Sequence, residues 1–354
     1  MSHSASIQYH LLSWRSLISA GVSFAILGAL WWMISSGREG EAGALFVSTL
    51  NNTLWSLASL YIVTQLIQSI LRAKRYQMLL LADGEGQVPA LLHTLYVTFS
   101  RNMFVDMVPA RVGELSYILM MNRGHQVAVV ACVSSLVLSL FFDIIALGIM
   151  LLVLVLVAIN TAQGVNSMVI ISLGLILVIA VLILMLLYGV DLILRMINKM
   201  FAKLNEAWFK RLLGVFLDVL SSVSRIGHCG IIVKTLFLSL LIRIAKYAGL
   251  YVLFLAVTTG NASAAVEIQW WQVIPAFIAA EAAASLPVPS LMSFGPYEGG
   301  GLLVLATFGV DPALAGMLMF VIHLLSQVVD YLLGAVGLVG FTLVAGRSPQ
   351  TGPQ

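Results

Sequence analysis

The residues most able to do chemistry are charged side chains inside long apolar segments. Arg243 and Lys246 lie three positions apart near the centre of the apolar segment 231–257, so in a helix they share one face. Arginine binds phosphate with two parallel hydrogen bonds, and lysine adds a compact positive charge. Because ionisable groups are costly in an apolar interior, they mark either a functional site or a buried ion pair. The pair predicts an anion-binding site or, with equal weight, internal pairing with a carboxylate: Asp143, Glu298 or Asp330.

A second set of candidates lies where glycine and proline interrupt apolar segments. The first break contains Pro109-Ala-Arg-Val-Gly-Glu114, and the second, 286–301, contains Gly295 and Glu298. Such breaks exclude a continuous helix, and the amides freed at a half-helix N-terminus attract anions. These breaks predict a binding site formed by five residues: Arg111, Gly113, Glu114, Gly295 and Glu298. The alternatives are a salt bridge from Arg111 to Glu114 or Asp106, and a simple helix N-terminal charge at Glu298.

Further ionisable residues lie in the middle of two very long apolar segments. Asp143 falls within 127–159 and Asp330 within 312–345, where His323, Gln327 and Asp330 form one helical stripe. Such a stripe must face the protein interior. We therefore take Asp143, His323 and Asp330 as proton-coupling candidates, with interhelical hydrogen bonding as the alternative and as the preferred role of Gln327.

The composition identifies the environment of these residues. The chain of 354 residues is 60% hydrophobic and 9% charged, with a mean hydropathy of +1.03. No soluble domain of this size needs so much apolar surface, so the sequence indicates a polytopic helical membrane protein. The two cysteines, Cys132 and Cys229, have no metal-ligand spacing, and we expect no metal site, no cofactor and no nucleic-acid partner.

The apolar segments predict both full spans and partial ones. The candidate spans are 16–35, 46–71, 89–109, 127–159, 167–188, 231–257, 270–287 and 312–345. The shorter apolar pieces 112–121 and 299–310 cannot cross a hydrocarbon core of about 30 Å at about 1.5 Å per residue. Each is therefore expected to return as the second limb of a re-entrant hairpin.

Loop charges predict the orientation of these segments. The segment 190–230 is rich in lysine and arginine and amphipathic, so we place it on the cytoplasmic side, together with Arg72, Lys74 and Arg75 after the second span. The uncharged loop 160–166 is then external, and both termini are cytoplasmic. With this orientation the two hairpins open on opposite sides of the membrane.

We therefore predict an all-α polytopic membrane protein with an inverted-topology repeat. It would contain about six full transmembrane helices and two re-entrant hairpins, built from about eight hydrophobic segments. Residues 1–354 would form one integral membrane domain, with repeat A at about 46–159 and repeat B at about 231–345. Span 167–188 and the basic segment 190–230 would join the repeats.

The two breaks also carry a resemblance to a known family. Pro109-Ala-Arg-Val-Gly-Glu114, Phe294-Gly-Pro-Tyr-Glu298 and the basic tract after the second span resemble motifs of the lysylphosphatidylglycerol synthetase transmembrane-region family, over roughly 16–345. Pro296 and Tyr297 replace the family's usual glycine-rich lead into the second glutamate. The resemblance implies a flippase-like module, here a stand-alone one, and its motif positions are Arg111, Gly113, Glu114, Gly295 and Glu298.

From these residues and this resemblance we expect a transporter that moves an anionic lipid between leaflets of the bacterial cytoplasmic membrane. The cargo would be an anionic phospholipid or a polyprenyl-phosphate-type lipid, and rocking of one repeat against the other would alternate access. A homodimer is compatible with the sequence. Two other readings remain open: an intramembrane lipid-phosphate enzyme, and a non-transporting partner of an envelope-lipid synthase or glycosyltransferase. No phosphatase-type Ser-Arg-Ser-Gly loop is present, so we expect no catalytic residues and no enzyme.

Overall fold

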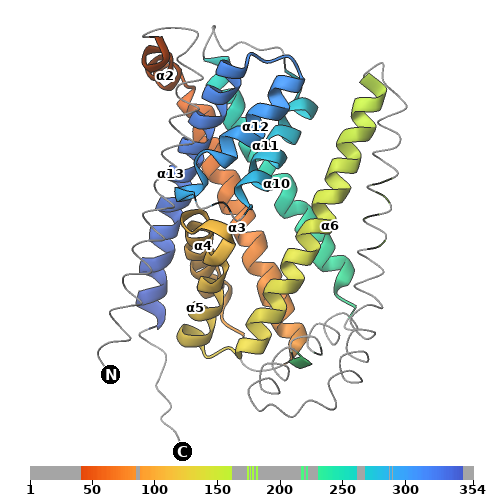
Figure 1. Cartoon of the computed structure of the whole chain (residues 1–354). Helices are drawn as coiled ribbons and strands as arrows, with labels where there is room; N and C mark the ends of the chain where they lie inside the picture. The colour runs from red at the N-terminus through yellow and green to blue at the C-terminus, as the bar shows by residue number, and fades with distance from the viewer. Residues whose placement is uncertain are drawn as a thin grey trace, which may run out of the picture. The chain divides into compact units, whose positions relative to one another are not determined.

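The computed structural model describes residues 41–84, 88–161, 174, 176, 178, 181, 217–218, 221, 230–260, 268–286, 288 and 290–345. Throughout these residues the regular structure is helical (Figure 1). The predicted spans 16–35 and 167–188, both termini and the amphipathic segment 190–230 lie outside the described residues, apart from isolated positions.

The described helices follow one another in the order in which the sequence predicts apolar segments. They are α2 (Glu41–Asn51), α3 (Trp55–Asp83), α4 (Leu91–Met107), the 3-10 turn η1 (Pro109–Glu114), α5 (Leu115–His125), α6 (Val129–Thr161), α10 (Ile232–Thr259), α11 (Trp270–Ala284), the 3-10 turn η4 (Leu291–Ser293), α12 (Pro296–Thr307) and α13 (Pro312–Ala345). Both breaks are present, because short 3-10 turns separate α4 from α5 and α11 from α12.

Three of the described helices are long and apolar enough to cross a membrane: Val129–Ile159, Ile232–Thr259 and Pro312–Val344. Each coincides with a predicted span. The short α5 and α12, of 11 and 12 residues, are too short to cross, as predicted for second limbs. The chain is thus an all-α polytopic membrane protein, and the inversion of the repeats stays a prediction.

The predicted span 46–71 differs from the structure at both of its ends. Its N-terminal part belongs to α2, and the chain breaks at Asn52–Leu54, where the Leu54 N–H donates to the Ala256 carbonyl of α10. Beyond residue 71, α3 continues to Asp83, because its sequence contains no glycine or proline before Gly84. Arg72, Lys74 and Arg75, which were predicted to follow the second span, therefore lie on the helix itself, and their cytoplasmic side stays a prediction.

The chain forms two compact units that share the long helices. Of the described residues, those within 41–65, 101–114 and 247–334 belong to unit 1, and those within 66–100, 115–246 and 335–345 belong to unit 2. Within unit 1, α11 lies along α12 (Figure 1), and the turns η1 and η4 contact each other. Within unit 2, α5 packs on α6, and Tyr76 stacks on Tyr117 with ring centroids 4.4 Å apart.

Close packing of α11 on α12 in the second hairpin depends on a glycine, which has no side chain. A Cβ atom at Gly300 of α12 would lie 2.6 Å from the Ala279 carbonyl oxygen and 2.8 Å from the Ala283 Cβ of α11. At the neighbouring Gly299 a Cβ would meet nothing within 4 Å. The two adjacent glycines therefore have different roles, and only Gly300 lets the helices approach.

We predict opposite effects of alanine at these two positions. Gly300→Ala should lower the unfolding temperature of the detergent-solubilised protein, because overpacking costs about 1–3 kcal/mol. Gly299→Ala should leave it unchanged or raise it, since alanine favours a helix over glycine by up to about 1 kcal/mol. Equal unfolding temperatures for the two variants would contradict the packing of α11 on α12.

Candidate functional site

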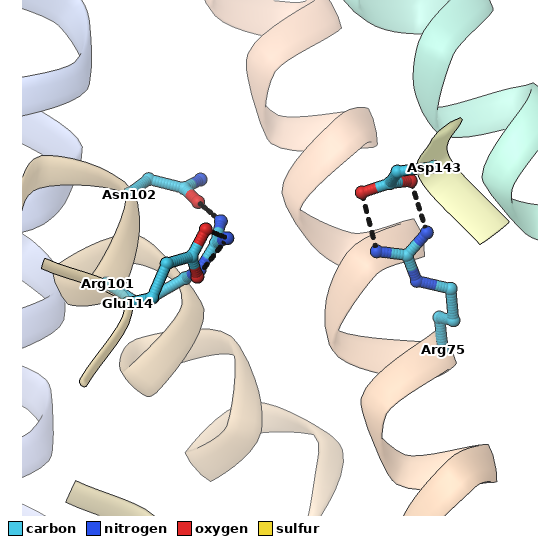
Figure 2. Close-up of polar contacts among 5 residues, drawn as sticks. All are labelled: Arg75, Arg101, Asn102, Glu114 and Asp143. Atoms are coloured by element: carbon cyan, nitrogen blue, oxygen red, sulfur yellow. Dashed lines mark hydrogen bonds and ion pairs between the residues drawn. The ribbon is translucent and has the colours of Figure 1, made fainter. Parts of the chain in front are cut away.

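The first break holds a buried ion pair. Arg101, on α4, donates from Nε to Glu114 Oε2 at 2.7 Å, and its Nη2 contacts both carboxylate oxygens (Figure 2). Its Nη1 donates to Asn102 Oδ1 at 3.0 Å. Both charged side chains are buried. Gly113 makes this possible, because a Cβ there would collide with the Phe104 backbone of α4.

This pair changes the role predicted for Glu114. Arg111 was one expected salt-bridge partner of Glu114, whereas the guanidinium that holds Glu114 in the structure is that of Arg101. The side chain of Arg111 lies outside the part of the chain whose side chains are described. Gly113 and Glu114 are thus placed at the turn η1, against α4.

The second break holds a chain of three buried polar side chains, which we call the Glu298 chain. Glu298, on α12, accepts the Gly295 N–H at Oε2 (2.5 Å) and contacts His323 Nδ1 of α13 through Oε1 (2.6 Å). On the far side of the ring, Gln327 Nε2 lies 3.0 Å from His323 Nε2. Glu298 is fully buried and His323 is 2% exposed, so the chain lies in the interior of unit 1.

Aromatic rings fix the imidazole in this position. Tyr297 stacks on His323 with centroids 4.1 Å apart, and the Phe294 ring lies 4.6 Å away. Gly295, between Phe294 and Pro296, has a φ of 95°, a conformation that a side chain strongly disfavours. The predicted residues Gly295, Glu298 and His323 are therefore brought together, with Gly295 shaping the turn that aims its own N–H at the carboxylate.

Asp143, in unit 2, is surrounded by arginine side chains. Arg75 Nη1 lies 2.5 Å from Asp143 Oδ1, and Arg75 Nη2 donates to Oδ2 at 3.2 Å (Figure 2). Arg75 Nη1 also donates to Ser239 Oγ of α10 at 2.6 Å. Arg72 and Arg243 lie close enough for their charges to act on the same carboxylate. We call these five residues the Asp143 cluster: Arg72, Arg75, Asp143, Ser239 and Arg243.

The cluster includes one of the two cations that the sequence singled out. Arg243 and Lys246 are both half-buried on α10, one turn apart. Asp143 is thus the carboxylate near Arg243, as the internal-pairing alternative allowed, and three guanidinium groups act on this single carboxylate. These cations lie on α3 and on α10, a helix long and apolar enough to cross a membrane, and their gathering is compatible with an additional anion from outside the chain.

Asp330 is half-buried on α13, and its charge acts on Tyr61 and Tyr331 in unit 1. Glu281, the weaker candidate on α11, accepts a hydrogen bond from the Tyr247 hydroxyl at 3.1 Å. Among the described residues, no group of three or more histidine, cysteine, aspartate or glutamate side chains is placed to hold a metal ion.

Neither Arg75 nor Arg101 was among the site residues predicted from the sequence. Arg75 was predicted only as part of the basic tract after the second span, and its side chain is 1% exposed. The uninterrupted helical sequence from Trp55 to Asp83 was the signal that could have placed it in the interior. Arg101 lies thirteen residues before Glu114, across a turn, so no local spacing rule links them.

Helices of spanning length, two interrupted hairpins and buried charge pairs define a multi-pass membrane protein with a polar interior. The family model for the lysylphosphatidylglycerol synthase TM region matches residues 16–334, and the chain belongs to this family of membrane domains. No curated protein and no solved structure matches the chain.

A double-mutant cycle tests the pairing of Arg75 with Asp143. Arg75→Met or Asp143→Leu alone should destabilise the protein by about 3–5 kcal/mol, because each leaves a buried charge without its partner. The double variant should lose less than the sum, since both charges are gone. Lys74→Met, at the exposed neighbouring position, is the matched control and should have little effect.

Unfolding temperatures in detergent provide the measurement. An Asp143→Leu variant as stable as the Lys74→Met control, or single effects that simply add in the double variant, would contradict the ion pair.

Proposed function

We propose that the protein moves an anionic lipid between the leaflets of the bacterial cytoplasmic membrane by alternating access, with both termini in the cytoplasm. The observation that carries this proposal is the Asp143 cluster, in which three arginines gather around one carboxylate among the helices α3, α6 and α10. A membrane domain that holds cations in its interior has a reason to do so when its ligand is an anion.

The chemistry of the cluster favours a phosphate-bearing headgroup. Guanidinium groups form paired hydrogen bonds with phosphate oxygens, and they are less strongly hydrated than an ammonium group. Arg75 is held in place by Asp143 and Ser239, so it would act as a fixed part of the proposed headgroup site. Arg243 and Lys246, both half-buried on α10, would contact the headgroup itself.

The lipid tails would remain in the bilayer while the headgroup crosses. The described helices expose many large apolar side chains, including Leu303 on α12 and Leu332 on α13, as a lipid-facing surface does. Movement of the headgroup through a polar interior would avoid the transfer of a phosphate through hydrocarbon, which opposes spontaneous exchange. An anionic phospholipid and a polyprenyl-phosphate-type lipid share this headgroup chemistry.

Reconstituted vesicles test the proposal. Protein-containing vesicles should equilibrate a fluorescent phosphatidylglycerol between leaflets, as measured by the fraction that a membrane-impermeant quencher reaches over time. Protein-free vesicles should retain the label in one leaflet. Equal kinetics in the two preparations would contradict lipid transport.

A charge-neutralising double variant tests the residues. Arg243→Gln with Lys246→Gln should slow exchange of the anionic label about tenfold or more, because each charge-assisted hydrogen bond contributes about 1.5–3 kcal/mol. Lys234→Gln on the exposed face of the same helix is the control and should exchange at the wild-type rate. Unchanged exchange in the double variant would remove both residues from the proposed site.

A further inference from the structure

We propose that the Glu298 chain binds the proton that drives lipid movement, with His323 Nε2 as the atom that is protonated and Gln327 as the switch that accommodates it. The inference rests on the proposed function and adds its energy source and coupling residues. Its basis is the hydrogen-bond pattern around one buried imidazole.

The geometry defines the protonation state of the resting chain. Gln327 presents its amide nitrogen, a donor, to His323 Nε2, so Nε2 accepts and carries no hydrogen. The ring hydrogen is then on Nδ1, which donates to Glu298 Oε1. With the Gly295 N–H donating to Oε2, the Glu298 chain consists of an ionised carboxylate beside a neutral imidazole. Its net charge is therefore −1.

A second arrangement of the same atoms accommodates one more proton. Gln327 is buried, and its Oε1 has no hydrogen-bond partner among the described residues. Rotation of the amide by about 180° would exchange its nitrogen and oxygen, so that Oε1 accepts from a protonated Nε2. The number of hydrogen bonds to the ring stays the same in both states. One proton therefore requires one amide rotation and no displacement of α12 or α13.

Protonation of His323 would change the net charge of the Glu298 chain. A carboxylate in an apolar interior is costly, and protonation of His323 converts the net charge of −1 into a neutral ion pair. Tyr297 stacks on the ring, and Glu281 on α11, Tyr247 on α10 and Asp106 on α4 all act electrostatically on Tyr297. Tyr61 on α3 interacts electrostatically with Tyr297 and with Asp330 on α13. The carboxylates whose charges act on these two tyrosines are Asp106, Glu281, Glu298 and Asp330.

This charge change links the proton to the lipid. We assign the link to alternating access: the state of the protein that binds the headgroup is the state in which the Glu298 chain is protonated, so proton binding strengthens headgroup binding. By thermodynamic reciprocity the headgroup strengthens proton binding to the same degree. The two species should therefore move together, as a symport in which one proton and one anionic headgroup cross from the acidic side to the alkaline side.

Vesicles with a pH difference of one unit test this coupling. In wild-type vesicles the fluorescent phosphatidylglycerol should accumulate in the leaflet on the alkaline side, approaching about a tenfold ratio, because one pH unit supplies about 1.4 kcal/mol per proton. A pH-sensitive dye in the lumen should report a proton flux that accompanies the lipid. Dissipation of the pH difference with an ionophore should return the label to an even distribution.

Variants at the Glu298 chain should separate proton coupling from lipid movement. Glu298→Gln and His323→Gln should abolish the accumulation and the lipid-dependent proton flux. Asp311→Asn makes the same carboxylate-to-amide change at an exposed position between α12 and α13, where the Asp311 side chain caps Leu314, and it should behave as wild type.

The outcomes are distinguishable. If no vesicle moves lipid, the proposed function fails and the coupling fails with it. If wild-type vesicles equilibrate lipid but do not accumulate it under the pH difference, the proposed function stands and the coupling is wrong. Accumulation that persists in both Glu298→Gln and His323→Gln would show that protons act elsewhere.

Discussion

A charged side chain that loses contact with water must keep hydrogen-bond partners, because the transfer of an isolated ion into an apolar interior costs far more than burial of its carbon atoms returns. Four carboxylates are buried in the described part of this chain, and the contacts of three of them show how that condition is met. Glu114 binds a guanidinium from the preceding helix, Asp143 binds a guanidinium from α3, and Glu298 binds a backbone amide and an imidazole. The positions of α3, α4, α6, α12 and α13 within their units follow largely from these contacts.

The interrupted helices are the means by which two of these carboxylates are positioned. A continuous helix would use its own amides for internal hydrogen bonds, whereas the break before α12 leaves the Gly295 N–H available for Glu298. Glycine is needed at both breaks, at Gly113 for close approach to α4 and at Gly295 for its positive φ. At the second break, one of the amides that could attract an anion, that of Gly295, is used by a carboxylate of the protein itself. Cargo binding is therefore better assigned to the cations of the Asp143 cluster.

Much of this arrangement could be predicted from the residues. Apolar length identified α6, α10 and α13, and the density of glycine and proline identified both breaks, because hydrophobic periodicity and helix breakers are local properties. The helical stripe of His323 and Gln327 was also visible. The pairing of Arg75 with Asp143, 68 residues apart, was not, because no local rule links distant helices. The extension of α3 through Arg72, Lys74 and Arg75 was missed because the predicted span was ended at residue 71, where the apolar run ends, although the helical sequence continues without a break to Asp83.

The central claim is that the interior cations bind an anionic lipid headgroup, and native mass spectrometry of the purified protein tests it most directly. The wild-type protein should retain a phosphate-bearing anionic lipid, either a phospholipid or a polyprenyl phosphate, whose occupancy falls sharply when Arg243 and Lys246 are both replaced by glutamine. Retention of only zwitterionic lipids, or the same anionic lipid at equal occupancy on both proteins, would contradict the account.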